Sequence, residues 1–207
     1  MHMTRFTVFI AVPIIFLSAC SRSGADWIIE PGVRVGPITS KSCHDDLVSL
    51  YGSTNVVTTI VGIGEGFDAA ASIIFPGDPT KKIEVVWSSS ETKCGTHTIL
   101  IRSGNRSVWK TVDGITLGQS IIDIEQLNGG PFKIAGYGWD YGGGVQDFMG
   151  GKLSRNGVFI IMGPTASIPE SERSSVLGDK LFNSTDPFMR KLNPVVEFMR
   201  VDLYEKR

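Results

Sequence analysis

The sequence predicts an α+β fold made of two tandem repeats, each a short helix followed by an antiparallel β-meander. Residues 35–52 and 112–129 match at a constant spacing of 77 positions, as in the pairs Thr39 and Thr116, Asp46 and Asp123, and Gly52 and Gly129. Both stretches are followed by apolar runs separated by Gly, Asp and Pro, which is typical of strands and turns. Because a short helix and a small sheet each expose one apolar face, we expect the two units to share a sheet and to pack both helices on it.

Each repeat is expected to begin with a helix and to continue with three strands. The expected helix caps are Ser42 with Asp45 and Thr116 with Gln119, and the expected ends are Gly52 and Gly129. The strand patterns are at 55–64, 69–77 and 81–88 in the first repeat, and at 131–139, 143–151 and 157–163 in the second. A short helix over 187–192, capped by Ser184 or Thr185, and a last alternating strand complete the chain.

The N-terminus reads as a targeting segment. Arg5 is followed by an apolar run of about a dozen residues, which is signal-peptide length and too short to span a bilayer. The run ends in Leu17-Ser18-Ala19-Cys20, which resembles the lipobox of bacterial lipoproteins. This resemblance implies removal of residues 1–19 and acylation of Cys20, with 20–26 as a short linker. An ordinary secretory signal is the alternative. Ser21 after the cysteine implies the outer membrane by the same resemblance, with the folded part on its periplasmic face.

The remaining chain is expected to form one compact domain, with the first repeat at 27–111 and the second at 112–207. Without Arg5 the chain has 19 basic and 21 acidic residues, because the full count is 20 and 21. The chain has no excess of basic residues, so its composition does not indicate nucleic acid as a partner. No phosphate loop, His-Glu-x-x-His or Gly-x-Ser-x-Gly motif occurs, so no cofactor is predicted.

Two cysteines remain after Cys20 is set aside, an even number in an oxidising compartment. Cys43 opens the first predicted helix and Cys94 follows a predicted strand. A disulfide between them is the favoured interpretation, and two free thiols are the alternative. His44 and His97 accompany the cysteines, so a zinc site is a third interpretation, although adjacent Cys and His residues rarely bind the same ion.

The segment "GYGWDYGGG", residues 136–144, has the most unusual composition in the chain. If it is extended, Trp139 and Tyr141 share one face and Asp140 points the other way. Two aromatic rings beside a carboxylate are typical of a binding platform, and "GIGEGFD", with Glu65, occupies the corresponding place in the first repeat. The alternative is structural: rings that cover a helix, glycines that form a hairpin, and a carboxylate that accepts turn hydrogen bonds.

An enzymatic interpretation would use acidic residues as a catalytic pair. A glycosidase needs two carboxyl groups about 5 to 10 Å apart, and the candidates are Glu65, Asp68, Asp140 and Asp147. Acidic residues in glycine-rich segments are more often turn formers. Hydrolysis of cell-wall material by Glu65 or Asp140 is therefore the alternative to binding.

Two further resemblances concern the fold and the role. One short pattern occurs twice, as Ile38-Thr39 with Leu50 and Gly52 and as Ile115-Thr116 with Leu127 and Gly129. This pattern is similar to the repeated unit of the β-lactamase-inhibitor-protein fold and of the outer-membrane assembly lipoprotein BamE. The strings "PGVRVGPIT", "WKTVDGITLG" and "GWDYGGG" also resemble bacterial lipoproteins without an assigned activity. The first resemblance implies a protein-binding scaffold. We therefore expect a non-enzymatic envelope lipoprotein that is anchored in the membrane and binds a protein or another envelope component through Trp139, Asp140, Tyr141 and Glu65. A purely structural lipoprotein is a third interpretation.

Overall fold

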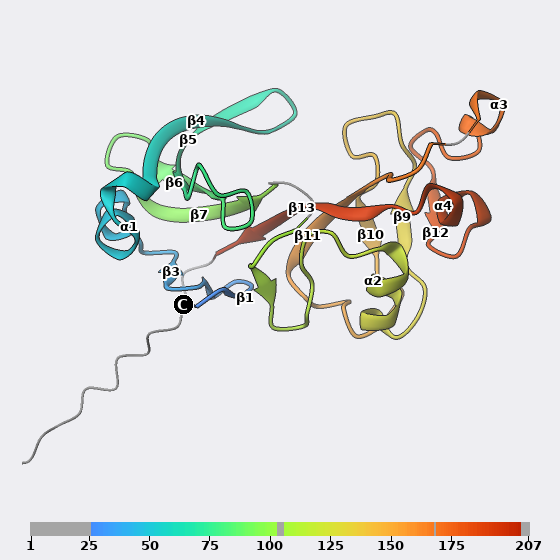
Figure 1. Cartoon of the computed structure of the whole chain (residues 1–207), viewed down its shortest axis with the longest axis horizontal. Helices are drawn as coiled ribbons and strands as arrows, with labels where there is room; N and C mark the ends of the chain where they lie inside the picture. The colour runs from blue at the N-terminus through green and yellow to red at the C-terminus, as the bar shows by residue number, and fades with distance from the viewer. Residues whose placement is uncertain (1–25, 103–105, 168, 204–207) are drawn as a thin grey trace, which may run out of the picture.

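The computed structural model describes residues 26–102, 106–167 and 169–203. It has a mixed α+β fold with mostly antiparallel sheets and a few short helices, as predicted (Figure 1). The largest sheet has six antiparallel strands in the order β11 (Val158–Gly163), β13 (Val195–Asp202), β7 (Cys94–Ile101), β6 (Ile83–Ser89), β5 (Phe67–Ile74) and β4 (Val56–Gly64). The last strand therefore pairs with both β11 and β7, and it joins a strand from the first half of the chain to one from the second half.

A three-stranded antiparallel sheet continues from β11. Its order is β10 (Val145–Asp147), β9 (Lys133–Ala135) and β12 (Leu181–Asn183). Gly144 forms a bridge with Ile161, and the amide of Met162 donates to the carbonyl of Gly143 at 2.8 Å. These contacts connect the two sheets, so the lobe with β4 to β7 and the lobe with β9, β10 and β12 lie on either side of β11 and β13 (Figure 1).

A small third sheet lies near the start of the described chain. It has the order β3 (Ile38–Thr39), β2 (Arg34–Val35), β1 (Ile28–Glu30) and β8 (Lys110–Thr111), and its β1–β8 pair is parallel. Strands of two or three residues carry no recognisable alternation, and the sequence did not predict β1, β2 and β3.

The two main helices are α1 (His44–Tyr51) and α2 (Ile121–Asn128), which begin and end 77 residues apart. The remaining helices are α3 (Glu170–Arg173), α4 (Pro187–Leu192) and the 3₁₀ turn η1 (Ser53–Asn55). One large core receives side chains from α1, α2 and α4 together with one face of the sheet, which confirms the packing of the helices on it. In the part of the chain that the structure describes, no helix has the length and apolar character needed to cross a membrane.

The expected helix caps were wrong by a few residues. The amide of Cys43 donates to Asp46 at 2.8 Å, and Ser120 with Asp123 forms the capping box of α2. The other predicted pair, Thr116 and Gln119, stabilises the preceding loop. Its Thr116 hydroxyl donates to the carbonyl of Trp109, and the Gln119 amide donates to that of Gly114. The helix α4 has its predicted bounds, and its N-cap is Asp186 instead of Ser184 or Thr185. Several polar residues precede each helix, so local pattern alone does not select the cap.

Candidate functional site

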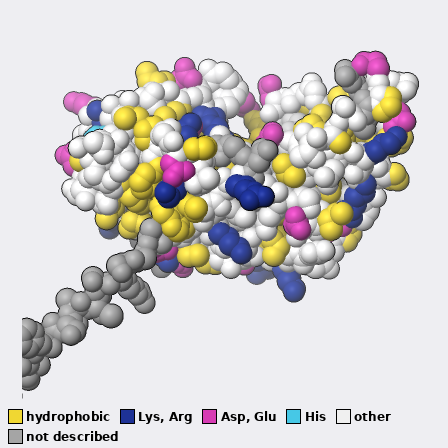
Figure 2. Space-filling model, in the orientation of Figure 1, with side chains coloured by type: hydrophobic (Ala, Val, Ile, Leu, Met, Phe, Trp, Pro, Cys, Tyr) yellow, Lys and Arg dark blue, Asp and Glu magenta, His cyan; other side chains and the backbone are white. Residues whose placement is uncertain are grey.

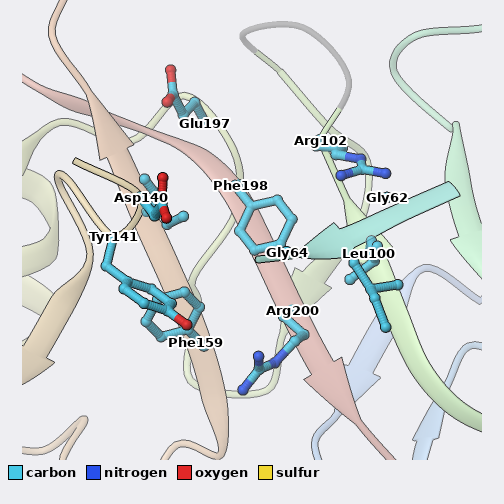
Figure 3. Close-up of a pocket in the computed structure, with 12 residues that line it drawn as sticks. Gly62, Gly64, Leu100, Arg102, Asp140, Tyr141, Phe159, Glu197, Phe198 and Arg200 are labelled. Carbon is cyan, nitrogen blue, oxygen red and sulfur yellow. The ribbon is translucent and has the colours of Figure 1, made fainter. Parts of the chain in front are cut away.

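The face of the sheet opposite the large core carries a second, smaller set of side chains. Strand alternation sends Ile99 and Met199 into the large core, whereas their neighbours Leu100 and Phe198 point to the other face. A cleft of about 540 Å³ lies over this second face (Figure 3). Its lining comes from β4, β7, β11, β13 and the loop after β9: Gly62, Ile63, Gly64, Leu100, Arg102, Asp140, Tyr141, Phe159, Ile161, Glu197, Phe198 and Arg200.

The β4–β5 hairpin forms one wall of the cleft because it curls over the sheet. Although β4 is the edge strand farthest from β13, Gly62 and Gly64 line the same cleft as Phe198. A small apolar cluster holds the hairpin down, in which Val61 and Ala71 pack with Val86, Leu100, Ala69 and Phe198. Small alanine side chains on β5 allow this close approach. The hairpin tip, with Glu65 at φ 51°, therefore lies over the face of the sheet opposite the large core.

The loop over residues 136–144 forms the opposite wall. The amide of Ala135 donates to the carbonyl of Gly144, and that of Gly143 donates to the carbonyl of Ala135. A Cβ atom on Gly143 would lie 2.2 Å from the carbonyl oxygen of Met162, so only glycine fits where the loop crosses β11. The Tyr137 hydroxyl donates to that same oxygen at 3.0 Å. The loop is thus held against β11 by hydrogen bonds and by a close backbone approach.

The sequence predicted an extended strand at this point, and that was wrong. Strand β9 ends at Ala135, and Trp139, Asp140 and Tyr141 lie in a bend and turn. The indole Nε1 of Trp139 donates to the carbonyl of Gly136 at 2.8 Å, and the Trp139 and Tyr141 rings meet edge to face with centroids 5.5 Å apart. The aromatic pair is therefore made by a turn. Both rings stay more than a third exposed, and they line hollows on the face opposite the large core.

One hydrogen bond joins the two walls. The Tyr141 hydroxyl donates to Oε1 of Glu65, which connects the loop after β9 to the tip of the β4–β5 hairpin. This bond, together with the burial and the negative charge around the hydroxyl, raises the pKa of Tyr141. The two segments singled out by composition, 136–144 and the one around Glu65, therefore meet over the cleft.

Two smaller hollows extend the cleft along β13. One of about 310 Å³ is lined by Trp139, Tyr141, Phe159 and Gln146, and another of about 300 Å³ includes Leu100 and His97. Arg200 lines all three hollows. The site is thus an elongated groove. Figure 2 shows that the surface is hollowed between the two lobes.

The charged side chains in the groove differ in whether they have partners. Arg102 contacts Oε2 of Glu84 at 2.6 Å, while Arg200 lies 3.6 Å from Asp202 and stacks over the ring of Phe159. Asp140 and Glu197 line the cleft without a hydrogen bond or ion pair to any residue in the described ranges. Partial burial raises the pKa of the Glu197 carboxyl, because the charged form is poorly solvated there.

The remaining acidic candidates are not gathered in this cleft. Asp147 accepts the amide of Met149 at 2.7 Å and serves a turn after β10, and neither it nor Asp68 lines any of the three hollows. Sequence reasoning missed the β13 contribution, Glu197 and Arg200. The alternation of β13 could have indicated Arg200, since its neighbours Met199 and Val201 are buried.

The disulfide between Cys43 and Cys94 is present and confirms the favoured interpretation. It links the N-cap of α1 to the first residue of β7. The bonded sulfurs are not available as zinc ligands. His44 instead contacts the hydroxyl of Ser72 at 2.9 Å, and within the described ranges no group of three or more His, Cys, Asp or Glu side chains is arranged to hold a metal ion. The predicted acylation site, Cys20, lies outside the described residues.

Comparison of the chain with protein-family models, curated proteins and solved structures finds no match in any of the three.

Proposed function

We propose that this chain is a lipid-anchored bacterial envelope protein that binds a partner protein through the groove along β13. The observation that carries the proposal is the meeting of two sequence segments over one surface. The tip of the β4–β5 hairpin and the loop 136–144 are joined by Tyr141 and Glu65, and between them lies an apolar floor. Half-exposed aromatic rings beside a preformed groove are typical of protein-binding surfaces.

The place of the β4–β5 hairpin relative to the start of the described chain agrees with an anchor at the N-terminus. The described chain starts beside β1 at the lower edge of Figure 1, while the β4–β5 hairpin lies at the upper edge. A protein held at Cys20 would therefore turn the hairpin side away from its membrane. Labelled palmitate should be incorporated by the wild type and not by a Cys20→Ala variant, and equal labelling of both would remove the anchor from the proposal.

The two-repeat architecture, and with it the likeness to the β-lactamase-inhibitor-protein fold, belongs to the same proposal. Besides the two helices, strands β4 and β9 start 77 residues apart, at Val56 and Lys133. The strands β7 and β13 meet as an antiparallel pair, fourth and fifth in the order β4, β5, β6, β7, β13, β11. The first proposed repeat thus contains the strands β4 to β7, and the second contains β9, β10, β11 and β13. These correspondences support a duplicated unit whose two copies meet at the β7–β13 pair, although β9 and β10 of the second copy lie in the separate three-stranded sheet.

A photo-crosslinking amino acid in the groove tests the binding function. Ile63 lines the cleft and is 45% exposed, and Val112, an apolar residue of the β8–α2 loop outside it, is even more accessible at 60%. We expect the probe at Ile63 to capture a defined partner from intact envelopes, the probe at Val112 to capture none, and a Trp139→Ala background to reduce the capture at Ile63 at least fivefold. Equal capture at both positions would reject the groove as the binding site.

The same variants separate binding from hydrolysis. Glu65 and Asp140 are both exposed, on a hairpin tip and a turn. If the chain turns over cell-wall fragments and Glu65→Gln or Asp140→Asn abolishes that turnover, the hydrolase is the better interpretation. If neither variant has such an effect and no partner is captured at Ile63, the structural role remains.

A further inference from the structure

We propose that the groove binds an extended segment of a partner protein in which a lysine or arginine side chain is flanked by apolar residues. This inference rests on the proposed binding function and specifies its ligand. The groove is elongated, because three adjoining hollows share Arg200 and run along β13. A peptide in extended conformation matches that shape, since its alternate side chains point into and out of the groove.

The floor of the groove selects apolar side chains. Leu100, Phe159, Ile161 and Phe198 line it, and they come from three neighbouring strands of one sheet. In Figure 3, Phe198 lies near the centre of the cleft, between the β4 residues and the loop that carries Asp140. Apolar surface in a concave site gains free energy when a ligand covers it, about 25 cal/mol for each Å². A ligand with only polar groups would leave this contribution unused.

The charges around the floor select a cation. Both arginines already have carboxylate partners, Arg102 with Glu84 and Arg200 with Asp202, and Glu65 accepts the hydroxyl of Tyr141. Asp140 and Glu197 have no such partner among the described residues. A cationic ligand would supply the missing charge at both carboxylates, whereas an anionic ligand would be repelled by them and would compete with Glu84 and Asp202 for the two arginines.

The aromatic side chains support the same assignment. Tyr141 and Trp139 flank Asp140 in the chain, and the two residues are 38% and 39% exposed. An ammonium or guanidinium group that reaches Asp140 comes within range of ring faces that attract it. The raised pKa of Glu197 agrees with this, because a nearby cation would relieve the cost of its charged form. Carboxylate, ring and apolar floor therefore point to a basic side chain beside apolar ones.

Short peptides test the ligand chemistry directly. The probes are acetylated and amidated Phe-Lys-Phe-Lys-Phe, the same peptide with glutamine at both lysine positions, and the same peptide with glutamate. They are titrated into the full-length chain in detergent and followed by calorimetry. We expect the lysine peptide to bind at least tenfold more tightly than the glutamine peptide, and the glutamate peptide to bind most weakly. Equal affinities for the lysine and glutamine peptides would overturn the proposal.

Charge-removing variants locate the effect. An Asp140→Asn, Glu197→Gln double variant should lose at least tenfold in affinity for the lysine peptide and change less than twofold for the glutamine peptide. The matched control is the double variant Glu91→Gln, Asp113→Asn, which removes two exposed carboxylates outside the groove and should behave as the wild type. An unchanged preference for lysine in the groove variant would overturn the assignment.

Spermidine provides the remaining arm, because it carries amines without apolar side chains. We expect it to bind at least tenfold more weakly than the lysine peptide, and equal binding would overturn the claim that the floor takes part. Failure of this inference is distinguishable from failure of the proposed function. The probe at Ile63 could capture a partner in a Trp139-dependent manner while the lysine and glutamine peptides bind with equal affinity. That result would support the proposed binding function and reject the proposed ligand chemistry.

Discussion

The helices α1 and α2 occupy matching places in the chain and are attached to the fold in different ways. The helix α1 buries Leu47 and is tied to β7 by the disulfide at its N-cap. The helix α2 buries Ile121 and Ile124, has Ser120 at the corresponding N-cap position, and is held by polar contacts of Glu125 and Asn128. A disulfide thus attaches α1 to the rest of the fold, and a network of polar contacts attaches α2.

The network of α2 starts from a buried amide. Asn128 donates to the carbonyls of Gly130, Pro131 and Phe148 and accepts the amide of Leu153. The position 77 residues earlier holds Tyr51, whose buried hydroxyl has no hydrogen-bond partner in the described ranges. The last turn of α1 receives the side-chain amide of Asn55 on the Tyr51 carbonyl at 2.9 Å, a single contact in place of the network at the end of α2. The comparison therefore predicts that stability depends on the N-terminal end of α1 and on the C-terminal end of α2.

The largest effect is expected from removal of the disulfide. The bond closes a loop with a sequence separation of 51, and the lost constraint on the unfolded chain corresponds to about 4 kcal/mol of unfolding free energy. A Cys43→Ser, Cys94→Ser double variant keeps a capping residue at position 43, like the serine at the start of α2. Urea denaturation should show this loss, and wild type with reductant should match the variant. A loss below about 1 kcal/mol would mean that packing alone holds α1.

A smaller loss, of about 3 kcal/mol, is expected for Asn128→Ala. The variant leaves several buried backbone groups without partners, each at a cost of about 1 to 3 kcal/mol unless water reaches them. Gln126→Ala, on the exposed face of the same helix, is the control and should change the unfolding free energy by less than about 0.5 kcal/mol. Similar losses in both variants would show that the amide network does not anchor α2.

Much of this fold was predictable because its signals are local. The fixed spacing and the glycines at 52 and 129 located both helices, and alternation located the long strands β4, β6 and β13. The disulfide was predicted from the even number of cysteines left after Cys20, together with the oxidising compartment that the N-terminal segment led us to expect. The short strands β1, β2, β3 and β12 were missed, since two or three residues show no period and their pairing depends on tertiary contacts.

The groove was only half predictable, for a different reason. Composition singled out Trp139, Asp140, Tyr141 and Glu65, but their meeting depends on how far the β4–β5 hairpin curls over the sheet. That curl is set by the packing of Val61 against Leu100, which are distant in sequence. The pairing of charges is equally non-local, so the difference between Arg102 with a partner and Glu197 without one is visible only in three dimensions.

The ion pair of α2 should contribute less than its amide network. Glu125 accepts from Arg190 and from the hydroxyl of Ser184, and its side chain is 15% exposed. We expect Glu125→Gln to lower the unfolding free energy by about 2 kcal/mol, since the guanidinium loses its charged partner. A double-mutant cycle with Arg190→Gln should give a coupling of about 1 kcal/mol or more. Additive losses would show that the two residues act separately. Val48, the corresponding residue of α1, has no charge to lose.

The smallest effect, and the only gain, is expected for Tyr51→Phe. The hydroxyl of Tyr51 is buried without a partner, and burial raises its pKa above the ordinary value for tyrosine. The ring packs edge to face on Phe75 with centroids 5.4 Å apart, and phenylalanine keeps that contact. Removing the hydroxyl should therefore raise the unfolding free energy by about 1 kcal/mol in urea denaturation. A loss of the same size would mean that water satisfies this hydroxyl, and that the last turn of α1 has a polar attachment like that of α2.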